Sequence, residues 1–592
     1  MYRPILDSVA GSLFLTALVA MLPLLTLFVL LGVLRISAWK AALASLVVSL
    51  GVAIFAYSMP TGQALSAGAE GAVFGFFPIL WIVLNAIWLY NMTVVTGHFD
   101  VLRRSFARVS DDQRIQAVII AFCFGALLEA LAGFGTPVAI TSVMLIALGF
   151  RPIKAATVAL VANTAPVAFG ALAVPITTLA AVTGLPEHDL GAIVGRQTPL
   201  LGVFVPMALV YIIDRGRGVR ATLPATLVCG LAFALAQFAT SNYLSTQLTD
   251  IVASLVSALA VVLLVRVWHP AEPYVEAPEE EYAAAGAGAG QPGQAGQPVE
   301  PARRRRHESH VVEGVPSATF GGYDHPISEG GGTAEELAAR DAGRHDTPAE
   351  VFKAYAPYLV IIVIFSLSQI PVIKDLLDAP TKSFHWPGLD LQTASGKAST
   401  LPTFKFNWLS AAGTLMLISG IVSIPVIGIS LGKAVRAYGR TYRQLAPAIV
   451  TVMAVLGLAY VMNSSGQTAT LGKWMAGAGG VFAILSPILG WLGVAVTGSD
   501  TSSNSLFGAL QVATAKDVGL HPALMAAANS SGGVLGKMVS PQNLAIAAAA
   551  VGLSGREGDI FRKVIGWSLV FLVFMCVLVY LQTTAVLSWM IP

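Results

Sequence analysis

The chain has 592 residues, of which 55% are hydrophobic and only 11% are charged. Soluble domains carry roughly 25% charged residues, so this composition excludes an ordinary soluble protein and indicates a polytopic membrane protein. The formal net charge of +3 is too small to indicate a nucleic-acid partner. The cysteines, Cys123, Cys229 and Cys576, lie far apart in apolar runs, which argues against a disulfide framework or a cysteine metal site.

In chain order, the apolar runs predict about 12 membrane-spanning helices of the ~20 residues that a bilayer requires. The first run has no basic segment before it, so we interpret it as a span and not as a cleavable signal peptide. The predicted spans cover residues 10–34, 39–58, 74–95, 155–181, 200–213, 221–241, 248–266, 355–372, 408–431, 445–463, 523–550 and 564–590.

Two further apolar stretches, 115–150 and 476–515, are too long for one span, and a glycine-containing turn interrupts each. The first contains Glu129-Ala-Leu-Ala-Gly-Phe-Gly-Thr-Pro-Val-Ala-Ile140, and the second contains Thr497-Gly-Ser-Asp-Thr-Ser-Ser-Asn504. Hydrocarbon offers no partner to the backbone groups that such turns free, so broken helices occur where they line a protein-enclosed site. We therefore predict two re-entrant hairpins and, from them, a transporter.

The basic residues cluster in alternate loops, as the positive-inside rule requires. With both termini outside, every basic cluster falls on the cytoplasmic side, and the opposite loops hold Glu70, Glu187, Asp189 and Asp250. This topology makes the first hairpin enter from the cytoplasm and the second from outside. The basic clusters are Arg35 and Lys40; Arg103, Arg104, Arg108 and Arg114; Arg151 and Lys154; Arg215, Arg217 and Arg220; Arg303–Arg306; Lys433, Arg436, Arg440 and Arg443; and Arg556, Arg562 and Lys563.

Opposite entry predicts an inverted repeat, and three landmarks recur in the same order in both halves. Their spacings differ by several residues, so coincidence in a chain rich in small residues is the alternative. The first-half landmarks are Gly133-Phe-Gly-Thr-Pro137, Gly149-Phe-Arg-Pro152 and Ala162-Asn-Thr-Ala165. The second-half landmarks are Gly498-Ser-Asp-Thr-Ser502, Gly519-Leu-His-Pro522 and Ala528-Asn-Ser-Ser531.

These observations divide the chain into predicted units. Residues 270–352 are rich in Gly, Ala, Pro and charged side chains, so they cannot bury a core and are predicted to form a disordered cytoplasmic linker. The other units are N-terminal scaffold helices (1–114), the first hairpin with a broken helix (115–181), scaffold helices (182–269 and 353–475), the second hairpin with a broken helix (476–550) and a C-terminal helix (551–592).

The motifs resemble those of bacterial L-lactate permeases, and the likeness runs through nearly all membrane segments. They are Gly125-Ala-Leu-Leu-Glu-Ala-Leu-Ala-Gly-Phe-Gly-Thr-Pro-Val-Ala-Ile140, Val161-Ala-Asn-Thr-Ala-Pro-Val-Ala-Phe-Gly170, Thr497–Asn504 and Ala528-Asn-Ser-Ser-Gly-Gly-Val-Leu-Gly-Lys-Met-Val-Ser-Pro-Gln-Asn543. Two departures are Thr136, where some relatives are expected to have a smaller residue, and the long linker.

The resemblance implies a secondary transporter that imports lactate, and often glycolate, with protons across the bacterial cytoplasmic (inner) membrane. The two opposed hairpins also resemble the wider ion-transporter superfamily, whose members move a hairpin-containing transport domain against a scaffold. By that analogy 115–181 and 476–550 move like an elevator, and the flanking spans supply the scaffold and a homodimer contact. No cofactor beyond the coupling proton is implied.

A small hydroxy-acid anion needs positive potential for its carboxylate and polar groups for its hydroxyl. Half-helix N-termini supply the first, and both Thr136-Pro137 and Ser540-Pro541 are helix-start signals. Lys537 lies near mid-span, where a lysine is unfavourable unless it is paired or faces water. It is predicted either to bind the substrate carboxylate or to pair with Asp500. The predicted substrate-binding residues are Gly135, Thr136, Asn163, Thr164, Ser499, Thr501, Asn504, Asn529, Ser530 and Lys537.

Proton coupling needs a carboxylate whose charge changes within the cycle, and the candidates are Asp500 at one hairpin tip and Glu129 near the other. The Ser/Asn cluster could instead hold sodium, so a sodium-coupled carboxylate transporter of the same fold is the alternative. A membrane enzyme is disfavoured because the chain has no HExxH, GxSxG or paired-cysteine motif. A receptor is disfavoured because no sizeable folded soluble domain is predicted.

Overall fold

The computed structural model describes residues 2–34, 36–107, 109–133, 135–276, 346–368, 370–392, 402–553 and 556–592. This part is mostly helical and contains nine helices that are long and apolar enough to cross a membrane. A tenth results if the bent pair Pro152–Ala162 and Val167–Thr183 crosses as one span. The polytopic helical class is therefore confirmed, and the predicted number of about 12 spans stays a prediction.

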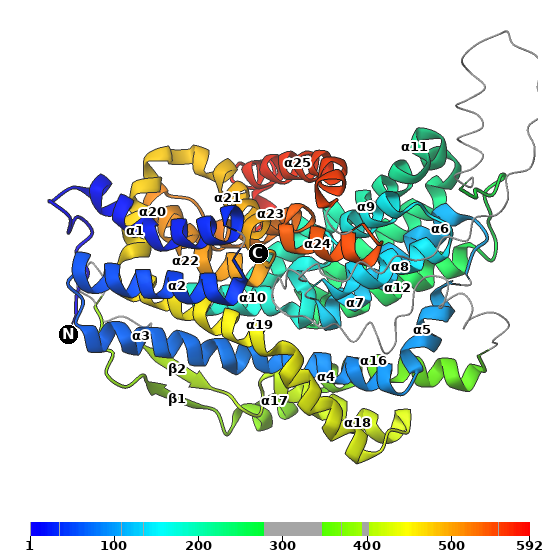
Figure 1. The fold of residues 1–592 in the computed structure, drawn as a ribbon, viewed down its shortest axis with the longest axis horizontal. Coiled ribbons are helices and arrows are strands. Elements are labelled where there is room, and N and C mark those ends of the chain that lie inside the picture. Colours follow the sequence, from blue (N-terminus) through cyan, green and yellow to red (C-terminus); the bar gives the residue numbers. More distant parts are fainter. Residues whose placement is uncertain are drawn as a thin grey trace, which may run out of the picture.

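A small antiparallel sheet departs from the all-α prediction. Its strands, β1 (Lys382–His385) and β2 (Thr403–Phe406), lie along α3 (Thr61–Phe74) in Figure 1. The ring of Phe404 on β2 contacts the ring of Phe74 on α3 edge-on. The strands occur between the predicted spans 355–372 and 408–431.

The N-terminal helices pack on α19 (Leu431–Ser465), and glycines on α3 bring two backbones together. A Cβ atom at Gly71 would lie only 2.4 Å from the carbonyl oxygen of Leu456, which is the kind of close approach that small residues permit in membranes. The prediction of Glu70 in an outside loop is wrong, since Glu70 lies inside α3 and is 1% exposed. The other helices here are α1 (Leu13–Phe28), η1 (Val29–Val33), α2 (Ala38–Gly51), η2 (Val52–Ala56), η3 (Gly75–Leu80), α4 (Trp81–Val95) and α5 (His98–Ala107).

The first predicted hairpin is a helix that two glycines interrupt. α7 (Gly125–Ala132) ends at Gly133, and α8 (Thr136–Ala147) begins after Gly135, whose φ of 84° is in the left-handed region that glycine adopts freely. The two helices pack against each other, as the arms of a hairpin do. The arm leading to the break, Gln113–Leu131, is 100% buried, so protein encloses it on all sides. Its earlier segments are α6 (Gln113–Ala117) and η4 (Val118–Phe124).

The second half of the chain repeats this succession. α21 (Phe482–Thr497) ends at Gly498, which has a φ of 74°, and Ser499 caps α22 (Asp500–Val518) by accepting a hydrogen bond from a backbone N–H. The arms pack closely, and the hydroxyl of Ser503 donates to a backbone carbonyl of α21 at 3.2 Å. The segments before this hairpin are α20 (Gln467–Met475) and η6 (Ala476–Val481).

The second landmark of the repeat is a turn in both halves. Gly149 and Gly519 have φ values of 95° and 73°, and each precedes a proline that begins the next helix. The third landmark differs between the halves. Asn163 follows α9 (Pro152–Ala162), where the chain bends by 64°, whereas Asn529 lies inside a helix. The segments that follow are η5 (Val167–Phe169) and α10 (Gly170–Thr183) in the first half, and α23 (Pro522–Gly536), η7 (Lys537–Val539) and α24 (Pro541–Ala550) in the second.

The broken helices lie in the middle of the molecule. In Figure 1, α10, α23 and α24 lie between α1–α3 on one side and α6, α9 and α11 on the other, and α22 packs against α10 and α23. α11 (Glu187–Tyr243) is 57 residues long and departs from helical geometry at Asp214 and Arg215, where the sequence predicts a loop between two spans. The remaining helices are α12 (Thr249–Leu264), α16 (Pro348–Leu367), α17 (Pro371–Asp378), α18 (Ala412–Ile427), α25 (Glu557–Gln582) and η8 (Ser588–Met590).

Most of the predicted linker, residues 277–345, lies outside the described residues. Its two flanks are placed and carry ion pairs. Glu276 contacts Lys154 at the start of α9, with 2.8 Å between Oε1 and Nζ. At the other end, Asp346 accepts two hydrogen bonds from Arg104 of α5, at 2.7 and 2.6 Å. The two flanks of the linker therefore form ion pairs with different helices, α9 and α5.

Candidate functional site

Both glycine breaks meet the beginning of one short helix, α24. A Cβ atom at Gly135, at the tip of the first hairpin, would lie 2.4 Å from Cδ1 of Ile546. A Cβ atom at Gly498, at the tip of the second, would lie 2.6 Å from Oε1 of Gln542. Since Gln542 and Ile546 are four residues apart, they occupy neighbouring turns of one helix face. Helix ends from both halves thus converge on a common region, as a site at a repeat interface requires.

The start of α24 follows the helix-start signal in the sequence. Ser540 is the N-cap, its hydroxyl accepts hydrogen bonds from the backbone N–H and the side-chain amide of Asn543, and Pro541 occupies the first turn. This prediction is confirmed. The helix start predicted at Thr136-Pro137 is also confirmed, because α8 begins at Thr136 with Pro137 in its first turn, but the residue at the N-cap position is Gly135 and not Thr136. The left-handed backbone needed at that break favours glycine there.

A buried ion pair joins the two halves next to this convergence. Nζ of Lys537, in the turn before α24, lies 2.5 Å from Oε1 of Glu129 on α7. The residues are 6% and 3% exposed. Oε2 of Glu129 accepts a hydrogen bond from Nδ2 of Asn163 at 2.9 Å. The predicted direct pair between Lys537 and Asp500 is wrong, because Lys537 pairs with Glu129 instead.

The backbone around Glu129 is shaped to admit its carboxylate. A Cβ atom at Gly170 would lie 2.8 Å from Oε1 of Glu129, so any larger residue there would displace the carboxylate from its present position. The next residues, Ala171, Leu172 and Ala173, have φ values of 44°, 59° and 60°. Residues other than glycine rarely adopt this left-handed backbone conformation. Residues with such strained backbone are often found at functional sites.

A second polar cluster surrounds Asp500 at the start of α22. Oδ2 of Asp500 accepts hydrogen bonds from the hydroxyl of Ser530 at 2.5 Å and from Nδ2 of Asn504 at 3.4 Å. Asn504 also donates to the carbonyl oxygen of Pro175 on α10 and accepts from Nδ2 of Asn529 at 2.9 Å. This cluster therefore connects the second hairpin to broken helices of both halves.

Three buried polar atoms in these clusters have no hydrogen-bond partner. They are Oδ1 of Asn163, the hydroxyl of Thr164 and Oδ1 of Asp500. Buried polar atoms are nearly always hydrogen-bonded in native proteins, so each such atom calls for an explanation. A carboxylate, a hydroxyl group, a proton or a water molecule would each supply what one of these atoms lacks.

The structure brings together most of the side chains proposed from sequence, and their roles stay predictions. Glu129, Asn163 and Lys537 form the first cluster, and Asp500, Asn504, Asn529 and Ser530 form the second. The others lie along the breaks: Gly135 against α24, Thr164 buried after α9, Ser499 as the cap of α22, and Thr136 and Thr501 half-buried at the tips.

Sequence reasoning missed several residues that shape the site. Gly170 and Gln542 both lie inside the motifs that carry the family resemblance, but only their polar or proline neighbours were singled out. Gln511 of α22 was missed as well; its Nε2 donates to Oδ1 of Asn529 and to the carbonyl oxygen of Ser486, both at 3.0 Å. A polar side chain in a predicted hairpin arm was the available signal.

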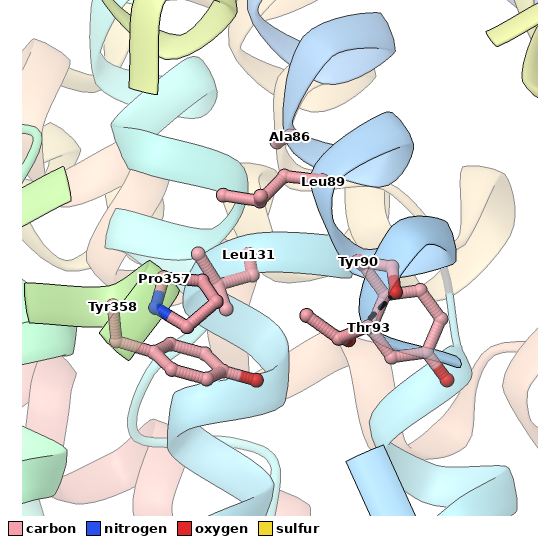
Figure 2. A pocket seen from close by; sticks show the side chains of 7 residues that line it. All are labelled: Ala86, Leu89, Tyr90, Thr93, Leu131, Pro357 and Tyr358. Carbon is pink, nitrogen blue, oxygen red and sulfur yellow. Dashed lines mark hydrogen bonds between the residues drawn. The ribbon is translucent and has the colours of Figure 1, made fainter. Parts of the chain in front are cut away.

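A small cavity lies beside the first hairpin (Figure 2). Its volume is about 10 Å³, about the space that one water molecule occupies, so it cannot hold a three-carbon acid. It separates Leu131 of the hairpin from α4 and α16 and is distinct from the polar clusters. The lining residues are Ala86, Leu89, Tyr90, Thr93, Leu131, Pro357 and Tyr358.

Comparison with known proteins gives one family. The family model for L-lactate permease matches residues 16–299 and 328–586. The chain is 39% identical to the L-lactate permease of Bacillus subtilis (strain 168), over 100% of this chain and 99% of that protein. It is 40% identical to the glycolate permease GlcA of Escherichia coli (strain K12), over 98% and 97% of the two chains. The L-lactate permease of the same strain is 38% identical, over 98% of each chain.

Among solved structures, the chain is similar to the YdaH transporter of Alcanivorax borkumensis, with a TM-score of 0.40 and 14% identity over 87% of this chain and 86% of that one. The family match covers nearly the whole chain, including both hairpins and both polar clusters. The chain therefore belongs to the L-lactate permease family, and it is a multi-pass membrane transporter and not an enzyme.

Proposed function

We propose that this protein imports L-lactate, and with it D-lactate and glycolate, across the bacterial cytoplasmic membrane by symport with protons. The observation that carries the proposal is the buried pair of Lys537 and Glu129 beside the two converging hairpin tips. It provides a cation for a carboxylate and a carboxylate that can take up a proton. The relatives named L-lactate and glycolate permeases support the same substrate class.

The coupling follows from competition for Lys537. The carboxylate of Glu129 pairs with the ammonium group of Lys537 in the same way that a substrate carboxylate would. The substrate can replace it at low cost only if Glu129 becomes neutral, because a second uncompensated carboxylate in a buried site is strongly unfavourable. A proton on Glu129 satisfies this condition, so proton and substrate bind together.

The remaining polar groups suit the hydroxyl of a 2-hydroxy acid. Oδ1 of Asn163, a residue that contacts Glu129, and the hydroxyl of the next residue, Thr164, are buried without partners, and one can accept while the other donates. Asp500 is the second proton-coupling candidate, since its carboxylate has hydroxyl and amide partners, and one oxygen has no partner. The remaining substrate contacts are assigned to the two hairpin tips (Gly135, Thr136, Ser499 and Thr501) and to the side chains around Asp500 (Asn504, Asn529 and Ser530). No further cofactor is proposed.

For the transport movement, we assign 115–181 and 476–550 to a moving unit and the flanking helices to a scaffold that also forms a homodimer. The close packing of both hairpin tips on α24 supports treating the two hairpins as one body. In this proposal the two hairpins enter the membrane from opposite sides, and both termini lie outside.

The experiment is uptake of labelled L-lactate into proteoliposomes under an inward proton gradient, with sodium absent. Accumulation that a protonophore abolishes is the expected result. Uptake that requires sodium would overturn proton symport and favour the sodium-coupled alternative. No uptake under either gradient would overturn the substrate assignment, which a panel of carboxylates would then address.

A further inference from the structure

Asp250 is a fully buried carboxylate outside the two polar clusters. The charge pattern of the sequence placed it in an outside loop, but it lies in the first turn of α12 and is 0% exposed. Its Oδ1 accepts a hydrogen bond from Nε2 of Gln237 at 2.8 Å, and its Oδ2 has no partner. Gln237 is held in turn by the hydroxyl of Thr198, which donates to its Oε1 at 3.2 Å. A buried carboxylate within a membrane span is a functional candidate by default.

No cation neutralises Asp250 within the described part of the chain. Of the elements packed against α12, η4 and α10 contain no charged residue, and α7 contains only Glu129. Arg196 of α11 donates to a side-chain oxygen and a backbone oxygen elsewhere, and the charged residues of α16, Glu350 and Lys353, lie in its first two turns. Because α12 packs against α7, which holds Glu129, ionised carboxylates at Asp250 and Glu129 would lie on neighbouring helices and repel each other without a compensating cation near Asp250.

Asp250 also lies near the end of the α11–α12 helix pair at which the two helices are joined. It follows the turn that joins α11 to α12, and in that turn Gln247 donates to the half-buried carboxylate of Glu187 at 2.7 Å. With the topology proposed above, this turn is on the outer side. Three carboxyl groups therefore belong to adjoining elements: Glu187 contacts the turn before α12, Asp250 lies in the first turn of α12, and Glu129 lies on α7, which packs against α12.

We propose that Asp250 carries the coupling proton between the outer side and Glu129, an inference that rests on the proposed proton symport. Gln237 fixes Oδ1 and leaves Oδ2 as the oxygen that gains and loses the proton. In the transfer, the O–H bond on Asp250 breaks as an O–H bond on Glu129 forms, directly or through one water molecule. Asp250 then takes another proton from the outer side, so no other reactant is needed.

The test compares two modes of transport in proteoliposomes. One is accumulation of labelled L-lactate driven by a proton gradient, and the other is counterflow, the exchange of labelled for unlabelled L-lactate without net proton movement. With one pH unit imposed, one proton per substrate supports about tenfold accumulation. Asp250→Asn is expected to abolish this accumulation and to keep counterflow within about twofold of the wild type.

Glu70→Gln is the matched control. Glu70 is also a buried carboxylate with an unpartnered oxygen, but it lies on α3 against α19, so both transport modes are expected to persist. The proposal is overturned if Asp250→Asn accumulates L-lactate like the wild type, or if it loses counterflow to the same degree as accumulation. If the wild type itself shows no proton-driven accumulation, the proposed function fails, and this result is distinct from failure of the Asp250 inference alone.

A measurement on the wild type covers the case in which Asp250→Asn does not fold. Dicyclohexylcarbodiimide reacts with protonated carboxyl groups in apolar surroundings: the carboxyl oxygen adds to the central carbon and the proton to a nitrogen, and the adduct rearranges to a stable N-acylurea. Peptide mass mapping is expected to find this adduct on Asp250, with loss of proton-driven accumulation. Modification of other carboxyl groups with none at Asp250 would overturn the proposal.

Discussion

Nζ of Lys537 lies 2.5 Å from Oε1 of Glu129, although 408 positions separate the two residues along the chain. The pair fastens the turn before α24 to the first hairpin, and both partners are buried. Each charge compensates the other, so the removal of one partner leaves an isolated charge in a buried site. This relationship gives the first prediction.

Lys537→Ala is expected to destabilise the protein by about 3–5 kcal/mol, because the carboxylate of Glu129 loses its cation. Thermal unfolding in detergent measures the loss. The double variant Lys537→Ala with Glu129→Gln is expected to recover much of the stability, since no buried charge remains, yet to stay inactive because nothing holds the substrate carboxylate. A double variant as unstable as Lys537→Ala would contradict the pairing.

Gly170→Ala tests the position of the Glu129 carboxylate. The new methyl group would lie 2.8 Å from Oε1 of Glu129 and would push the carboxylate away from Lys537. Substrate could then reach Lys537 without a proton on Glu129, so we expect fewer protons carried per L-lactate, measured as the ratio of the two fluxes. Gly439→Ala is the control, because a Cβ atom there meets nothing within 4 Å. An unchanged flux ratio in active Gly170→Ala protein would refute the competition mechanism.

Gly135→Ala tests the contact of the first hairpin tip with α24. The substitution places alanine at a φ of 84°, and its Cβ would lie 2.4 Å from Ile546. Gly519→Ala is matched to it, since Gly519 has a φ of 73° but open space around it. Both are expected to lose about 1–3 kcal/mol through backbone strain, and only Gly135→Ala is expected to lose transport. Equal transport in the two variants would show that the contact is dispensable.

Much of this arrangement is readable from the sequence, because glycine and proline mark its breaks. Gly133 and Gly498 end helices and Gly135 precedes the start of one where the motifs predicted hairpin tips, and Ser540-Pro541 starts α24 as expected. Local rules of this kind need no knowledge of distant contacts.

The partners of the charged residues could not be predicted in this way. The pairing of Lys537 with Glu129, and not with Asp500, depends on how α7 and η7 meet in three dimensions. The burial of Glu70 and Asp250 was missed for a related reason: Glu70 lies between predicted spans and Asp250 at the edge of one, and each is buried because neighbouring helices cover it. Hydropathy reports affinity for lipid, and these residues face protein.

The cysteines offer a test of the proposed moving unit. Sγ of Cys123, in η4 of the first hairpin, lies 3.6 Å from Sγ of Cys229 on α11, which is assigned to the scaffold. A disulfide needs about 2.05 Å between the sulfurs, so a small approach suffices. Oxidation with copper phenanthroline is expected to join them and to stop counterflow, and a reductant is expected to restore it. Cys229→Ser keeps Cys576 and is expected to be insensitive to the oxidant. Complete cross-linking with full transport would mean that η4 and α11 move as one body, which would contradict the boundary proposed between residues 181 and 182.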